Sequence, residues 1–406
     1  MQLRHCVVCG TTESELVFAV ARAPIHPFCP PAELGLAPGF GTLEIVSCAT
    51  CGHAYNAAFD IDRLDDLYAA MVLTNTPVSE SMIANLESTA EYILSKAPRN
   101  PVVADVGGGT GVLSRTMARR AREVHLVEPS RALRAADFEG TGVTLHSSSF
   151  PAPTLGDKVF DVIVSRQVVE HIPEPMPFLT ALRSRLHEDG IAYLEITSAE
   201  YIAQTRSIVD FHYPHVHYYR RATFETLLQR AGFDVIDVTD VKDGHDQGFL
   251  LRAATPRQVA PPPRIDTNAL AADLKARTDM GRQRLRAIDG VVALYGANAY
   301  SQALLGLFPS DARYGIMLDD TPMYEGQRAY GPGVELAIRR PSAEALNGVS
   351  AVIITAYLHD LGIARKVRQL QFTGPVFTVR ADHLADSGDR GAGLFRIADV
   401  AAAPVL

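Results

Sequence analysis

The sequence lacks an excess of basic residues, and this argues against nucleic acid as a partner. Its 406 residues include 38 lysines and arginines against 46 acidic residues, which gives a formal net charge of −8. Proteins that bind nucleic acids usually carry clustered positive charge. We therefore expect no nucleic-acid partner, although paired cysteine motifs such as those near this N-terminus often suggest one.

The sequence also lacks an uninterrupted apolar stretch long enough to cross a membrane. Its most apolar segment, residues 290–308, contains Asn298, Ser301 and Gln302 and is expected to form a buried strand, a turn and a helix. Residues 1–5 contain no apolar signal region. With 47% hydrophobic and 21% charged residues, the chain is expected to be a globular cytoplasmic protein without a membrane partner.

Cysteine is scarce, but four of the five cysteines form two copies of one motif. Each copy reads Cys-x-x-Cys-Gly, and the following glycines, Gly10 and Gly52, permit the backbone to bend behind the thiolates. Two such pairs complete a closed tetrahedral shell for a structural zinc ion. The predicted zinc ligands are Cys6, Cys9, Cys48 and Cys51.

Two disulfides in a secreted protein are the alternative interpretation, and the absence of a signal region disfavours it. Cys29 lies among prolines and is expected to be an inert loop thiol. His53 could replace a cysteine ligand, but two complete pairs make that unnecessary. Because a closed site has no position for water or substrate, we expect zinc to contribute to folding rather than to chemistry.

The chain is longer than one hydrophobic core usually serves, so we expect several domains. Residues 1–70 hold the cysteine motifs and are expected to form a small zinc-binding domain. Residues 71–257 alternate strand and helix patterns, and the alternation begins again in residues 258–406, after the proline run 261–263. The expected fold class is α/β, with a central Rossmann-like sheet and a second Rossmann-like C-terminal domain.

Short apolar runs separated by helical periodicity give the expected elements, and they favour mostly parallel sheets covered on both faces. The last two strands of the central domain are close enough in sequence to pair antiparallel. In that domain we expect a helix after Thr76, helices at 113–122 and 221–230, and strands at 102–104, 124–127, 162–164, 191–194, 233–238 and 248–253. In the C-terminal domain we expect strands at 291–295, 314–318 and 351–354.

A glycine-rich turn follows the first strand of the central domain and reads Asp105-x-Gly107-x-Gly109-x-Gly111. Glycines there let the backbone approach a ligand and leave amide groups pointing at it, although a tight turn without a ligand is the alternative. The alternating spacing differs from the Gly-x-Gly-x-x-Gly of dinucleotide folds. Glu128 ends the next strand and could accept hydrogen bonds from both ribose hydroxyls.

This turn, together with the element Glu170-His171-Ile172-Pro173, resembles the class I S-adenosylmethionine-dependent methyltransferases over roughly residues 80–255. The resemblance implies that the three glycines line the methionine moiety and that Glu128 holds the ribose. It places Ser149 and Phe150 near adenine and Gln167 at the methionine end of the cofactor; a solvated loop and a core aromatic are the alternatives for Ser149 and Phe150. The predicted S-adenosylmethionine site is Asp105, Gly107, Gly109, Gly111, Glu128, Ser149, Phe150 and Gln167.

The order of zinc motifs, methyltransferase domain and second nucleotide-binding-type domain resembles the bacterial deoxysugar C-methyltransferases over nearly the full length. In that family the substrate is a nucleotide-linked 4-keto sugar bound with the help of the C-terminal domain. The runs 295–297 and 330–333 resemble the glycine turns of that domain, and Asp319 would end its second strand. The resemblance implies a small-molecule substrate, most simply a nucleotide-linked sugar.

Carbon methylation requires a base that removes a proton next to a carbonyl. The candidate segment is 211–219, where His215 matches the family's catalytic histidine and Tyr218 and Tyr219 match its aromatics. The family's tyrosine falls on His212 and its glutamate on Pro214, which cannot carry a proton. The predicted catalytic residues are His215, with His212, Tyr213 and His217 as possible helpers.

Other interpretations of these residues stay open. Three histidines within six residues could bind a metal, but the segment lacks convergent carboxylates, and the histidines could also simply pack. The lost tyrosine and glutamate are consistent with an O- or N-methyltransferase of a small natural product. A sensor that binds zinc and cofactor without turnover is a further alternative.

Overall fold

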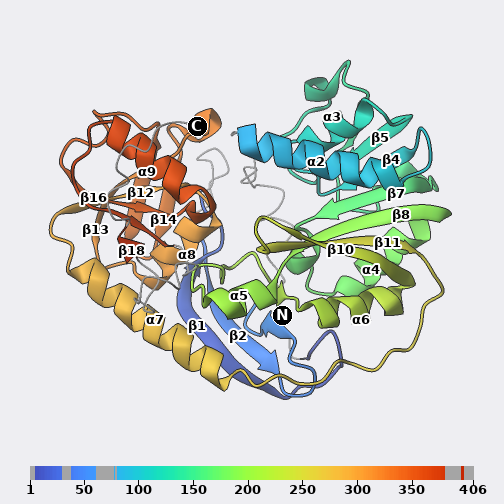
Figure 1. The fold of residues 1–406 in the computed structure, drawn as a ribbon, viewed down its shortest axis with the longest axis horizontal. Helices are drawn as coiled ribbons and strands as arrows, with labels where there is room; N and C mark the ends of the chain where they lie inside the picture. The colour runs from blue at the N-terminus through green and yellow to red at the C-terminus, as the bar shows by residue number, and fades with distance from the viewer. Residues whose placement is uncertain (1–4, 30–37, 61–76, 78–79, 380–394, 397–406) are drawn as a thin grey trace.

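The computed structural model describes residues 5–29, 38–60, 77, 80–379 and 395–396, arranged around three sheets (Figure 1). The predicted helix start at Thr76 lies outside the described residues. Within the described part of the chain, no helix has the length and hydropathy needed to span a membrane.

The central sheet has seven strands in the order β10-β11-β8-β7-β4-β5-β6. Its strands are β4 (Val102–Val106), β5 (Glu123–Val127), β6 (Val143–His146), β7 (Phe160–Arg166), β8 (Leu186–Thr197), β10 (Phe233–Val241) and β11 (Asp246–Ala253). The first five are parallel, whereas β11 pairs antiparallel with β8 and with β10. The parallel sheet and its antiparallel final hairpin, both expected from the sequence, are therefore confirmed.

Helices cover both faces of this sheet, because its buried strands alternate side chains between two apolar clusters. One cluster joins Val103 to Met117, and the other joins Ala104 to Leu227. On the first face lie α2 (Glu80–Lys96) and α3 (Val112–Ala118); on the second lie α4 (Pro175–Arg185) and α6 (Arg221–Ala231), with α5 (Ala199–Thr205) nearby (Figure 1). Both faces are therefore closed, as expected for an α/β domain.

The helix after the glycine-rich turn ends at Ala118 rather than at the predicted Arg122. The amides of Arg120 and Ala121 both donate to the Met117 carbonyl, and the amide of Arg122 donates to the Pro101 carbonyl. The last of these hydrogen bonds directs the chain into β5, so a tertiary contact overrides the helical pattern of residues 119–122.

The N-terminal sheet is antiparallel, in the order β1-β2-β3-β9. It contains β1 (Ser14–Pro24), β2 (Phe40–Cys48) and β3 (Ala54–Asn56), and its last strand is β9 (His217–Tyr218) from the central segment. Long-range pairing therefore joins the cysteine-containing segment to the predicted catalytic segment.

The C-terminal sheet also has seven strands, in the order β14-β15-β13-β12-β16-β17-β18. Parallel pairing joins β15, β13, β12, β16 and β17, so the second Rossmann-like sheet expected from the sequence is confirmed. The strands are β12 (Val291–Tyr295), β13 (Arg313–Leu318), β14 (Arg328–Gly331), β15 (Val334–Arg339), β16 (Val349–Ile354), β17 (Val376–Thr378) and β18 (Phe395–Arg396). Its helices are α7 (Asn268–Arg286), α8 (Ala299–Leu307) and α9 (Asp360–Gln369).

Strand β1 connects the parts of the molecule, since it packs against α7, α8 and β14 of the C-terminal domain (Figure 1). The backbone amide of Cys29 also donates to the Arg328 carbonyl at 2.6 Å. One apolar cluster therefore runs through all three segments of the chain.

Candidate functional site

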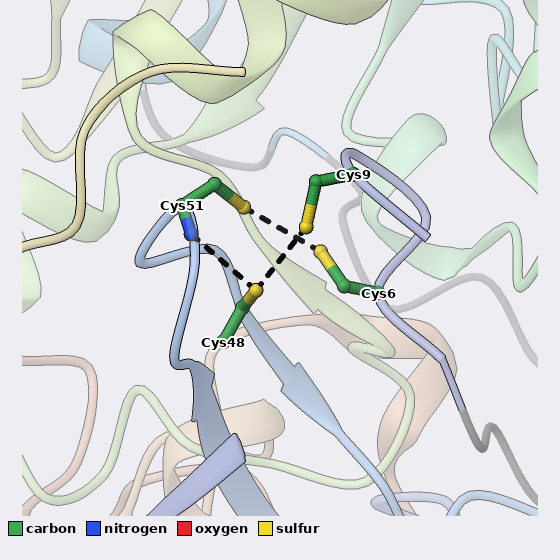
Figure 2. Close-up of side chains that lie close together, drawn as sticks. All are labelled: Cys6, Cys9, Cys48 and Cys51. Atoms are coloured by element: carbon green, nitrogen blue, oxygen red, sulfur yellow. Dashed lines mark hydrogen bonds between the residues drawn. The ribbon is translucent and has the colours of Figure 1, made fainter. Parts of the chain in front are cut away.

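The four predicted zinc ligands lie together at the N-terminal turns, with their Sγ atoms all within 4.8 Å of one another (Figure 2). The Sγ atoms of Cys6 and Cys51 are 3.6 Å apart, and those of Cys9 and Cys48 are 3.4 Å apart. These separations are too long for disulfides, whose sulfurs lie about 2.05 Å apart. They approach the edge of roughly 3.8 Å that a tetrahedron has when its Zn–S bonds are about 2.3 Å.

The backbone of the two turns also suits a thiolate site. The amides of Thr50 and Cys51 each point at the Cys48 Sγ from 3.4 Å, where they would stabilise negative charge. Gly10 and Gly52 have φ of 79° and 65°, as the predicted bend requires. All five cysteines are free, and burial raises the pKa of Cys29, which suits an inert loop thiol. The donor set therefore fits zinc.

His53 does not join the cysteine cluster. It is fully buried, and its Nε2 lies 3.1 Å from the Nδ1 of His217 in β9. The Nε2 of His217 in turn donates to the Pro173 carbonyl at 3.0 Å. Since His53 and Pro173 occupy both ring nitrogens of His217, this predicted helper has no nitrogen left for a substrate.

The glycine-rich turn lies between β4 and α3, as the sequence predicts. Gly107 has φ of 71°, and a Cβ there would come within 2.4 Å of the Val168 Cγ2, so Gly107 lets the loop after β7 approach. Gly109 has φ of 55°, and a Cβ there would meet no atom within 4 Å. The turn is therefore packed at its first glycine and open at the second, where a ligand could approach the backbone. Gly111, with φ of 72°, precedes α3.

Two buried carboxylates hold this turn. Asp105 Oδ2 accepts a hydrogen bond from Ser114 Oγ at 2.6 Å beneath the turn. The Glu128 oxygens accept from the amides of Gly109 and Ser130, each at 3.0 Å. Burial raises the pKa of both carboxyl groups. Glu128 thus connects the glycine-rich turn with the loop after β5, and its remaining lone pairs could accept ribose hydroxyls.

The loop after β7 contains Gln167, whose φ of 54° is uncommon for a residue other than glycine. Its amide donates to the Glu195 carbonyl, and its Nε2 donates to Asp246 Oδ2, both at 2.7 Å. Such a conformation persists where neighbouring contacts fix it, and these sites are often functional. Ser149 is exposed, whereas Phe150 is half-buried and lies edge-on to Phe178, with ring centroids 6.4 Å apart.

The predicted catalytic segment brings three imidazoles together. The ring centroid of His215 lies 4.0 Å from that of His212 and 4.7 Å from that of His171. Burial lowers the pKa of His215 well below its usual value, and it lowers the pKa of His212 to about 3 and of His171 to about 4. Among the described residues, Nδ1 of His212 and Nδ1 of His215 have no hydrogen-bond partner. His215 is therefore a buried neutral imidazole with a nitrogen available to accept a proton.

The other predicted helper, Tyr213, faces the N-terminal segment. Its hydroxyl accepts the Asp60 amide at 3.1 Å, and its ring stacks on Phe59 with centroids 5.0 Å apart. Glu170, the first residue of the element 170–173, is buried, and its Oε1 accepts a hydrogen bond from the Thr197 amide at 3.2 Å. Burial raises the pKa of Glu170 to about 8, so this carboxyl is a second proton carrier close in sequence to His171.

Sequence reasoning missed a buried polar cluster in which His245 lies between Asp210 and Asp246. Asp210 lies in the loop after α5, and His245 and Asp246 lie where the turn before β11 meets that strand. Further members come from the C-terminal domain. No local spacing relates them, because only the folded chain brings these segments together. The contact from Gln167 to Asp246 connects this cluster to the predicted cofactor site.

Comparisons with known proteins identify the central domain. Residues 79–238 match the family described as a methyltransferase domain. The ubiquinone biosynthesis O-methyltransferase of Ralstonia nicotianae is 33% identical over 131 residues, which cover 28% of this chain and 55% of that protein. The corresponding Parvibaculum lavamentivorans protein is 29% identical over 115 residues, covering 27% of this chain and 45% of its own. The chain thus spans about half the length of these curated relatives.

One solved structure that aligns with part of this chain is also a methyltransferase. A Clostridium acetobutylicum S-adenosylmethionine-dependent methyltransferase aligns with a TM-score of 0.38 and 14% identity, covering 48% of this chain and 99% of its own. The family match alone identifies residues 79–238 as a methyltransferase domain. Large segments on both sides of residues 79–238 lie outside the match.

Proposed function

We propose that the protein is an S-adenosylmethionine-dependent methyltransferase that methylates a carbon atom of a nucleotide-linked keto sugar. The observation that carries this proposal is the buried, neutral His215 with its available nitrogen. His215 lies in the segment between α5 and α6, after the carboxyl end of β8, and parallel α/β sheets bind their ligands at that edge.

In this proposal the cofactor supplies an electrophilic methyl group. Gly107, Gly109 and Gly111 bind its methionine part, Glu128 accepts the ribose hydroxyls, and Gln167 contacts the methionine end. Ser149 and Phe150 flank the adenine, while Asp105 fixes the turn from beneath. The match of residues 79–238 to the methyltransferase-domain family supports this assignment.

His215 would remove the proton from the carbon next to the carbonyl. The resulting enolate would take the methyl group from the sulfonium, whose methyl carbon–sulfur bond would break to leave S-adenosylhomocysteine. A neutral imidazole is the form that can accept this proton. Since Pro214 replaces the family's glutamate, the neighbouring proton carriers available to His215 are His212 and His171. The zinc ion at the four cysteines would stabilise the N-terminal turns and take no part in this transfer.

Methylation at oxygen is the second candidate, and one observation favours it. The curated relatives matched by this chain are named as O-methyltransferases of ubiquinone biosynthesis. An O-methyltransferase would use His215 to deprotonate a hydroxyl group, so the same geometry would serve a different acceptor.

Proton exchange distinguishes the two candidates. The protein is incubated in deuterium oxide with nucleotide-linked 4-keto sugars, and the carbon next to the carbonyl is followed by NMR. Carbon methylation through an enolate should give exchange at that carbon that depends on His215, and a product with a new carbon–carbon bond. A product carrying an O-methyl group, formed without exchange, would overturn the proposed chemistry in favour of the second candidate.

A further inference from the structure

A buried polar cluster lies where the central and C-terminal domains meet. We name its members, Asp210, His245, Asp246, Tyr300 and Tyr357, the junction cluster. Asp210 follows α5, His245 immediately precedes β11, and Asp246 is its first residue. Tyr300 is in the first turn of α8, and Tyr357 follows β16. Asp210, His245 and Asp246 are each at most 4% exposed, so their polar groups depend on one another.

The two carboxylates flank one imidazole. His245 Nδ1 lies 2.6 Å from Asp246 Oδ1, and His245 Nε2 lies 3.0 Å from Asp210 Oδ1. Both nitrogens can donate only when the ring is protonated. Burial opposes that charge, but Asp246 and Asp210 outweigh it and raise the pKa of His245 to about 9. Lys242 Nζ lies 2.6 Å from Asp246 Oδ2. The positive charges of Lys242 and protonated His245 therefore balance the negative charges of the two aspartates.

The C-terminal domain completes this arrangement. Tyr357 donates its hydroxyl to Asp210, with oxygen–oxygen distances of 3.1 and 3.3 Å. The Tyr300 hydroxyl lies 3.2 Å from His245 Nε2, and the two tyrosine rings pack with centroids 4.8 Å apart. Both tyrosines lie at the carboxyl end of the C-terminal sheet, where β12 and β16 end.

The other end of the cluster reaches the predicted cofactor site. Asp246 uses Oδ1 for His245 and Oδ2 for the Nε2 of Gln167. Gln167 has its uncommon backbone conformation here, and the next residue, Val168, occupies the space left by the absent side chain of Gly107. A continuous set of contacts therefore runs from the C-terminal tyrosines to the glycine-rich turn.

We propose that Tyr300 and Tyr357 are positioning residues of the methyltransferase site, although they belong to the other domain. Through Asp210, His245 and Asp246 they fix the side chain of Gln167, so the position of the C-terminal domain sets the geometry at the methionine end of the cofactor. This inference rests on the proposed function, since it requires the cofactor at the glycine-rich turn. By linkage, a substrate that moves the C-terminal domain would change cofactor affinity.

The test uses the full chain and S-adenosylhomocysteine, titrated by calorimetry. Tyr357→Phe removes only the hydroxyl that Asp210 accepts, and Tyr300→Phe removes the one beside His245. Each variant should weaken binding by about fivefold, which is less than the full loss of a hydrogen bond to a charged group because the effect reaches the cofactor only through the other members of the cluster and Gln167. Tyr314→Phe is the matched control, because its hydroxyl donates to the Phe308 carbonyl at 3.0 Å within the same domain. The control should bind like the wild type.

A double-mutant cycle separates positioning from a general loss of stability. If the tyrosines act through Gln167, adding Tyr357→Phe to Gln167→Ala should weaken binding no further. Wild-type affinity in both tyrosine variants, or effects that simply add in the cycle, would overturn the inference while leaving the proposed function intact. Failure of the wild-type protein to bind S-adenosylhomocysteine would overturn the proposed function, and this inference with it.

Discussion

Glu128 is the single residue on which the predicted cofactor site depends most directly. Its carboxylate is buried and already holds the amides of Gly109 and Ser130. In the proposed site, Glu128→Ala removes the acceptor for two ribose hydroxyls, and each such hydrogen bond contributes roughly 1.5–3 kcal/mol. Calorimetry should therefore find S-adenosylmethionine affinity lowered by at least about tenfold.

The exposed Glu139 offers a matched control in the same domain. Glu139→Ala removes a carboxylate of the same kind without touching the turn and should leave the affinity unchanged. Unchanged binding in a folded Glu128→Ala protein would show that the ribose lies elsewhere.

His215 is the residue that distinguishes catalysis from binding. His215→Ala should lower the turnover rate by about a hundredfold or more and leave cofactor affinity nearly constant, because a general base acts in the transition state. Burial holds the pKa of His215 below its usual value, so the imidazole stays neutral as the pH falls. The acid limb of the rate profile should accordingly lie below the usual range of a histidine side chain.

His187 is exposed and serves as the control for this substitution. If His215→Ala is as active as the wild type, and His187→Ala is equally active, His215 is a packing residue.

The sequence predicted His217 as a helper of His215 in catalysis, but the two histidines have different surroundings in the structure. His217 has both nitrogens occupied by His53 and Pro173, a contact that depends on a residue far away in the sequence.

At the scale of elements, local patterns predicted the strands and the sheet type well. Buried parallel strands such as β4 and β7 contain the apolar runs 102–104 and 162–164, and the spacing of β10 and β11 indicated their antiparallel pairing. The two-residue strand β9 carries no such pattern, because its pairing with β3 comes entirely from tertiary contact. For the same reason α3 ends before its helical periodicity does.

Helix α6 contacts the first cysteine turn, and this makes a prediction about zinc retention. Arg230 donates to the Val8 carbonyl beside Cys9 and, from Nη2, to the Val259 carbonyl at 2.6 Å. Arg230→Ala would leave these partly buried carbonyls unpaired, which should lower the free energy of unfolding by about 2 kcal/mol. Zinc release to a chelator, followed with a colorimetric indicator, should also become faster.

Arg252 provides the comparison, since its ion pair with Asp234 is largely exposed, with 65% of the arginine side chain accessible. Exposed pairs contribute less than about 1 kcal/mol, so Arg252→Ala should change neither quantity appreciably. Equal zinc release from both variants would mean that α6 does not stabilise the turn.

At the scale of the whole molecule, the sequence indicated three segments, but the way they meet required the folded chain. Strand β1 packs on α8 and β14, and Tyr300 and Tyr357 reach Asp210 and His245 across the junction. These contacts join residues separated by tens to hundreds of positions, so neither periodicity nor motif spacing could predict them. The proposed positioning of Gln167 is a property of this assembly rather than of one domain.

The shared core makes the predicted zinc site important for the stability of the whole chain. The four cysteines fix the turns that precede β1 and follow β2, and one apolar cluster continues from these strands into both larger domains. Metal binding free energy in such sites contributes directly to folding.

Elemental analysis should find one zinc per chain, and Cys48→Ser or chelation should lower the thermal midpoint by about 10 °C or more. Since β1 contacts the C-terminal domain, the loss should appear across the far-ultraviolet transition rather than in a small separate phase. Cys29→Ser, which alters a thiol outside the cluster, should keep both the metal and the midpoint. Purified protein without stoichiometric metal would show that the fold forms without zinc, and a Cys48→Ser variant as stable as the wild type would show that the Cys48 thiol does not stabilise it.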